Sequence, residues 1–265
     1  MMRDDLTSLV FPVHGEPIDP VAMARKDMQK NLPKRFYKEV RAELRDGIHV
    51  LLLDGRSAKT PARNALAVDD AHVAQVLVAE WDAQKDVINP LHMPMTRLLH
   101  SALDGVAREY AAVRAEMLRY AASDLICYRA VTPQTLVDEQ AKAWDTVLKF
   151  VADRFGAQFH PVSGVMFQPQ PEATLHAVEA ALAAYQRPLD LAALHVLTSI
   201  SGSVLIALSV AHGFLDAESG FATAHVDEQY QARVWGADEE ALARLALRRT
   251  DFATAAHALT GAKIA

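Results

Sequence analysis

The chain contains one cysteine, Cys127, among its 265 residues. A single thiol excludes an internal disulfide, a cysteine-based zinc site and a CxxC redox pair. It favours a reducing compartment. Charged residues make up 23% and hydrophobic residues 51% of the chain, a balance that is ordinary for globular proteins and that argues against extensive disorder.

The common catalytic motifs are also missing. The sequence contains no GxSxG, HExxH, GxGxxG or Walker A pattern. Residues 55–60 resemble a phosphate loop, but they lack the second glycine that lets a backbone form a nest of N–H donors. The eleven histidines are scattered and suggest no ligand set. We therefore expect no cofactor, no metal and no nucleotide. The formal net charge of −6 disfavours nucleic acid as a partner.

Targeting and membrane signals are weak. Residues 1–10 include Asp4 and Asp5 and resemble neither a signal peptide nor a mitochondrial presequence. Residues 191–215 carry no Asp, Glu, Lys or Arg and are long enough to cross a bilayer. However, this stretch contains many hydroxyl residues, and no basic cluster flanks it. We expect a buried core helix broken at Ser201-Gly202-Ser203, and no membrane insertion.

Two Asp-Gly pairs near the front of the chain predict β-hairpins. Asp46-Gly47 and Asp54-Gly55 bracket the apolar run at residues 48–53. With their neighbours they predict a three-stranded antiparallel meander and a further short strand. The strands that we expect are residues 36–44, 48–53, 57–60 and 65–68.

After residue 69 the apolar spacing becomes helical. Asp69 and Asp70 offer an N-cap to the first helix. The later helices that we expect are residues 95–110, a longer one through Tyr120 to about Ile126, and residues 135–155, 172–185, 189–212, about 218–235 and 239–259. The predicted fold class is α+β, with a small N-terminal antiparallel β-containing domain and a larger all-helical domain. We divide the chain into an irregular lead-in (1–33, with room for a short helix starting at Asp19), a β-rich domain with one helix (34–90) and a helical domain (91–265).

Three carboxylates lie within apolar patterns: Glu80, Asp104 and Asp124. Carboxylates crowded against an apolar surface can have a raised pKa and act in acid–base catalysis, so an enzyme built on this cluster is one alternative. Arg56 and Arg97 are possible partners for them. We favour a structural role as caps and ion pairs, because no nucleophile, metal ligand set or oxyanion device accompanies the three residues.

The net charge is concentrated in one stretch. Residues 216–240 contain seven acidic residues and one basic residue, so the whole formal charge of −6 lies here and the rest of the chain is neutral. An acidic surface beside an exposed Trp235 would attract a partner with a basic patch. Asp238 also suits a helix N-cap, and Glu239 and Glu240 suit the positive end of the last helix. Capping alone does not explain why the preceding segment is acidic.

Six short motifs follow one another between residue 34 and the C-terminus. They are Arg35-Phe36-Tyr37-Lys38; Leu53-Asp54-Gly55-Arg56 with Lys59-Thr60-Pro61; Glu80-Trp81-Asp82-Ala83-Gln84 with Met93-Pro94-Met95-Thr96; Tyr120 with Ser123-Asp124-Leu125; Gln140 with Trp144-Asp145; and Trp235-Gly236 with Asp238 and Glu240-Ala241. In this order and spacing they resemble the assembly chaperones for the catalytic head of F-type ATP synthase, the members that handle the alpha subunit.

The resemblance implies a protein that is not an enzyme. Such a chaperone binds the unassembled alpha subunit, prevents its aggregation and promotes assembly of the catalytic head. An acidic position in the last motif matters in this family, and its match here is Glu240. We predict a partner-binding site of Trp235, Asp238, Glu239 and Glu240.

The resemblance also bears on location and on the client. Mitochondrial relatives carry a presequence, whereas residues 1–10 of this chain do not resemble one. The expected location is therefore the bacterial cytoplasm. A protein-interaction module with another client remains an alternative.

Overall fold

The computed structural model describes residues 32–236 and 238–260. The predicted lead-in, including a helix starting at Asp19, lies outside the described residues except for its last two positions. The described chain divides into two compact units. Residues 32–36 and 84–89 belong to the smaller unit, in which Arg35 N donates to the carbonyl oxygen of Asp86 (3.0 Å). Residues 37–83 and 90–260 belong to the larger one.

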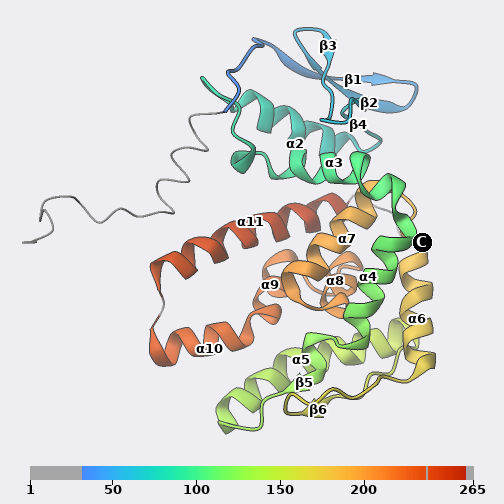
Figure 1. The fold of residues 1–265 in the computed structure, drawn as a ribbon, viewed down its shortest axis with the longest axis vertical. Helices are drawn as coiled ribbons and strands as arrows, with labels where there is room; N and C mark the ends of the chain where they lie inside the picture. Colours follow the sequence, from blue (N-terminus) through green and yellow to red (C-terminus); the bar gives the residue numbers. More distant parts are fainter. Residues whose placement is uncertain (1–31, 237, 261–265) are drawn as a thin grey trace, which may run out of the picture. The chain divides into compact units, whose positions relative to one another are not determined.

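The larger unit begins with a small antiparallel sheet (Figure 1). Strands β1 (Val40–Arg45), β2 (Ile48–Leu53) and β3 (Arg56–Ser57) form the predicted meander, and β4 (Ala67–Val68) pairs with β2. The first strand begins four residues later than expected. Both Asp-Gly pairs have positive φ at both residues, which is the conformation of a type I′ turn. The hairpin prediction is confirmed.

Ten α-helices follow among the described residues. They are α2 (Ala71–Asp82), α3 (Pro94–Asp104), α4 (Tyr110–Ala122), α5 (Gln134–Phe155), α6 (Glu172–Ala183), α7 (Pro188–Ser201), α8 (Val204–Ala211), α9 (Ala217–Ala224), α10 (Val226–Trp235) and α11 (Glu239–Thr260). Short 3-10 turns lie at Pro90–His92, Val106–Arg108 and Leu125–Cys127. The α+β fold class is confirmed, whereas the domain boundary near residue 90 stays a prediction.

The uncharged stretch at residues 191–215 forms the core of the helical part. Gly202, at a φ of 69°, ends α7, and the Ser203 side chain caps α8 by accepting from Ile206 N (3.0 Å). Helix α7 packs against α3, α4, α8 and α11, and α8 is buried along nearly its whole length. The predicted break is therefore confirmed. Among the described residues, no helix is both long and apolar enough to cross a bilayer.

Two predicted helices are interrupted. The helix expected over residues 95–110 stops at Asp104, and Gly105 N donates to the carbonyl oxygen of Ser101 (3.0 Å). The helix expected over residues 218–235 breaks at His225, whose ring stacks on Phe221 (4.1 Å between centroids) and places Nδ1 2.8 Å from the Phe221 carbonyl oxygen. This local contact replaces helical continuation and redirects the chain into α10.

A short parallel pair was not predicted. Strands β5 (Tyr128–Arg129) and β6 (Val162–Ser163) are each two residues long and pair across 34 positions of the chain. A two-residue strand has no periodicity to detect, so sequence patterns cannot find it. Apart from β6, residues 156–170 form no helix or strand.

Candidate partner-binding site

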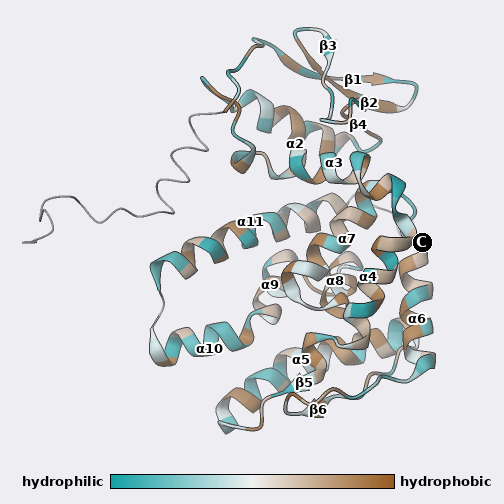
Figure 2. Ribbon diagram, viewed as in Figure 1, coloured by the Kyte–Doolittle hydropathy of each residue, from teal (hydrophilic) through white to brown (hydrophobic). Residues whose placement is uncertain are grey.

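Helix α10 is fixed on one side by α5. The Gln140 side chain donates to Asp227 (2.7 Å), Arg233 pairs with Glu139 (2.7 Å), and the Tyr230 hydroxyl lies 2.9 Å from that of Thr135. These contacts orient α10 and leave its other faces to solvent. Figure 2 colours α10 as largely hydrophilic.

Helix α11 has two unlike halves. Its C-terminal half packs against α3, α7 and α9 and buries Phe252, Ala255 and Leu259. In its N-terminal half every residue from Glu239 to Leu247 is exposed except Leu245, which is half-buried. Asp238 caps this half by accepting from Ala241 N (2.9 Å), as predicted.

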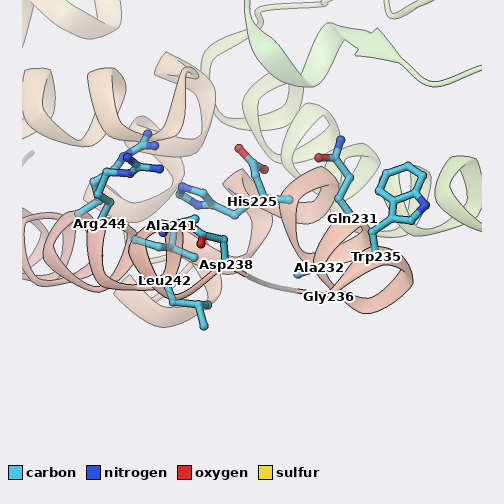
Figure 3. Close-up of a pocket in the computed structure, with 12 residues that line it drawn as sticks. His225, Gln231, Ala232, Trp235, Gly236, Asp238, Ala241, Leu242 and Arg244 are labelled. Carbon is cyan, nitrogen blue, oxygen red and sulfur yellow. Dashed lines mark hydrogen bonds between the residues drawn. The ribbon is translucent and has the colours of Figure 1, made fainter. Parts of the chain in front are cut away.

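A groove of about 460 Å³ separates α10 from the exposed half of α11 (Figure 3). Ala232 and Trp235 line it from α10, and Leu242 and Leu245 line it from α11. Trp235 is 77% exposed, and in Figure 3 its indole ring stands on the α10 side, opposite Arg244. The groove therefore presents apolar surface between polar rims, a combination typical of protein-binding sites.

The four predicted site residues all lie at the ends of α10 and α11 that form this hairpin. Trp235 and Asp238 line the groove, whereas Glu239 and Glu240 do not. Glu240 is exposed one turn before the groove-lining Arg244, with which it pairs (2.8 Å). We call Trp235, Asp238, Glu239 and Glu240, together with the groove, the α10–α11 tip.

Glu80, Asp104 and Asp124 do not form a cluster. Glu80 accepts from Met95 N (2.6 Å) and Thr96 N (2.8 Å) at the start of α3, whereas Asp104 is the last residue of α3. An eleven-residue helix is about 15 Å long, so these two carboxylates lie too far apart to act on one substrate atom. Burial raises the pKa of Glu80, while hydrogen bonds from Thr96 and Met95 oppose the rise.

Each of the other two carboxylates also satisfies backbone and hydroxyl donors. Asp104 accepts from the Thr60 hydroxyl (2.6 Å) and the Asn64 amide (2.7 Å); desolvation raises its pKa, but these bonds outweigh it and hold the pKa below its usual range. Asp124 is fully buried and accepts from Ile126 N and Leu205 N (both 3.3 Å). All three carboxylates thus accept hydrogen bonds that hold helix and loop ends, in line with the structural role that we favoured, and Glu80 and Asp104 do not share a site.

Comparison with known proteins decides the family. The sequence model described as ATP12 chaperone protein matches residues 34–152. Protein atp12, mitochondrial, of Schizosaccharomyces pombe is 23% identical over 222 residues, which cover 78% of this chain and 75% of that protein. Atp12 from Paracoccus denitrificans is 34% identical, with a TM-score of 0.80 over 86% of this chain and 98% of that one.

The chain belongs to the ATP12 chaperone family. The family of ATP synthase assembly chaperones expected from the six motifs is confirmed. The Atu1473 protein of Agrobacterium tumefaciens is similar along nearly the whole chain, at 44% identity and a TM-score of 0.83 over 92% of this chain and 91% of that one.

Most ATP12 family motifs in this chain support the fold. Tyr37 donates its hydroxyl to the Trp81 carbonyl (2.7 Å), and Asp54 accepts from the backbone of Lys38 and Glu39. Trp144 donates its indole N–H to the Thr223 carbonyl (2.8 Å). The last motif differs, because its Trp235 and Glu240 are exposed at the α10–α11 tip.

Sequence reasoning missed the apolar part of this candidate site. Ala232, Leu242 and Leu245 line the groove. They come together only because α10 and α11 face one another across it, and the sequence does not show that arrangement. One signal was present: Leu245, Phe252 and Leu259 recur at intervals of seven, so one stripe runs the length of α11. The sequence does not show that only part of that stripe is covered.

Proposed function

We propose that this protein binds the unassembled alpha subunit of F-type ATP synthase at the α10–α11 tip, prevents its aggregation and passes it on for assembly of the catalytic head. The observation that carries the proposal is the exposed Trp235 beside an open apolar groove in the segment that holds the whole net charge. Membership of the ATP12 chaperone family supports the class of function.

The chemistry of the tip suits a chaperone that releases its client. A subunit destined for a ring exposes an apolar and charged interface before assembly, which makes it prone to aggregate. A small apolar groove with acidic surroundings masks such a surface with limited contact area. The true partner subunit can then displace the chaperone, and the proposal needs no chemical step. We place this activity in the bacterial cytoplasm, in line with the bacterial sources of the structural relatives.

Light scattering by freshly diluted alpha subunit tests the proposal. We expect the wild-type protein to suppress aggregation at a near-stoichiometric ratio. Glu240→Lys should lose most of this effect, because it reverses a charge on the tip. A helix-end charge contributes only about 0.3–1 kcal/mol, so the melting temperature of the variant should change little.

Glu172→Lys is the matched control, because Glu172 is an exposed first-turn glutamate on α6, outside the tip. It should keep the suppression while making the same change at a helix start. Equal suppression by both variants would keep the chaperone and remove Glu240 from its site. No suppression by the wild-type protein would contradict the choice of client and favour an interaction module with another partner.

A further inference from the structure

The stripe along α11 is only half covered. Phe252 and Leu259 are buried by α3, α7 and α9, whereas Leu245, one heptad earlier on the same face, lines the open groove. Residues at heptad spacing meet neighbouring helices as a continuous seam. The seam therefore continues into a segment where Leu245 is only half-buried and lines open space.

A second cavity extends the open surface to the other side of the seam. It measures about 250 Å³ and is lined by Phe221 and Ala222 of α9 together with Ala246 of α11. The two spaces share Leu242 and Leu245, and together they form a trough along α11 from Ala241 to Arg249, a length of about 12 Å.

The charges around the trough are unbalanced. Two of its three arginines are paired with glutamates, Arg244 with Glu240 and Arg249 with Glu218, whereas Arg248 donates to the neutral Ile200 carbonyl (2.6 Å) and keeps its charge. Within residues 32–236 and 238–260, no ion pair involves Glu228 or Glu239. Glu228, Asp238 and Glu239 outnumber Arg248, so the net unpaired charge beside the apolar floor is negative.

We propose that this trough binds an amphipathic helix of the client, two to three turns long, that lies along α11 and carries Lys or Arg beside its apolar face. The proposal rests on the proposed function for the identity of the client, and deepens it by naming the element recognised. A helix completes the seam in the same way as α3, α7 and α9 do further along α11.

Overlapping 20-residue fluorescent peptides that cover the alpha subunit sequence test the proposal by fluorescence anisotropy. We expect the peptides that bind to combine helical apolar spacing with Lys or Arg. A proline at the centre of such a peptide should weaken binding by about tenfold or more, because proline interrupts a helix. Unchanged binding of the proline peptide would show an extended occupant and overturn the proposal.

Leu242→Glu and Leu247→Glu form a matched pair. The two leucines are 51% and 50% exposed on the same helix, but only Leu242 lines the trough. We expect Leu242→Glu to weaken peptide binding about tenfold or more and Leu247→Glu to change it less than about twofold. Equal effects of the two substitutions would overturn the proposed location.

The alpha subunit assay separates this proposal from the proposed function. If no peptide binds while wild-type protein still suppresses aggregation and Glu240→Lys does not, the helical occupant is wrong and the proposed function stands. If wild-type protein does not suppress aggregation, the proposed function fails, whatever the peptides do.

Discussion

Two tryptophans of the family motifs show how differently single residues serve this protein. Trp144 is 1% exposed and donates its indole N–H to the Thr223 carbonyl. The Arg129 guanidinium lies over its ring, with the guanidinium carbon 5.2 Å from the centre of the Trp144 ring. Trp235 is 77% exposed at the α10–α11 tip. Both tryptophans belong to the family motifs, but Trp144 is a core residue and Trp235 is a surface residue.

The two residues predict opposite outcomes on truncation. Trp144→Ala removes a buried aromatic side chain and should destabilise the protein by about 3–5 kcal/mol. A loss of that size lowers the melting temperature by roughly 10 °C in a chain of this length. Trp235→Ala should leave the melting temperature nearly unchanged and weaken client binding. Calorimetry checks both, and an unchanged melting temperature for Trp144→Ala would contradict its place in the core.

The buried Asp124 carboxylate predicts a pH dependence of stability. Desolvation raises its pKa to about 7, and the hydrogen bonds from Ser203, Leu205 and Ile126 only partly offset this. The unfolded chain has the ordinary value of 3.8. The folded state therefore binds the proton more tightly, so its contribution to stability is complete below about pH 4 and is lost as the pH rises to about 7.

Asp124→Asn should remove that part of the pH dependence. Urea unfolding between pH 5 and pH 8 would then show a smaller loss of stability with rising pH for the variant than for the wild-type protein. Identical slopes would mean that Asp124 is already ionised in the folded state at pH 5.

At the level of elements, α9 packs closely against both α8 and α11 at Gly220. A Cβ atom there would lie 2.5 Å from Val210 Cγ2 and 3.4 Å from the Phe252 ring. Gly220→Ala should therefore force α9 away from α8 and destabilise the protein by about 1–3 kcal/mol, measured by urea unfolding. Unchanged stability would show that α8 and α9 are not packed this closely.

The elements also show what the sequence could predict. The hairpins were predictable because Asp-Gly pairs favour the positive φ values of a type I′ turn. The break between α7 and α8 was predictable from Ser201-Gly202-Ser203. The break at His225 was not, because it depends on a contact of its ring with Phe221. The acidic half of the site was visible as charge, whereas the groove depends on the facing of two helices.

At the scale of the whole molecule, the charge is distributed very unevenly. The net −6 lies in residues 216–240, and four of the seven acidic residues of this stretch (Glu228, Asp238, Glu239 and Glu240) lie at the α10–α11 tip. Concentrated charge raises the rate of association with an oppositely charged partner, and salt screens it over about 10 Å at 0.1 M. Association with the alpha subunit should therefore slow on the order of tenfold as salt is raised, with a smaller change in dissociation. Stopped-flow fluorescence measures both rates, and a salt-independent association rate would contradict electrostatic attraction.

Hydrogen exchange of the protein, free and bound to the alpha subunit, tests the central claim most directly. The account predicts slower exchange on binding across α10 and the N-terminal half of α11, Val226 to Leu247, with the sheet from β1 to β4 unchanged. Slower exchange over the sheet, with α10 and α11 unaffected, would contradict the α10–α11 tip as the site that binds the client.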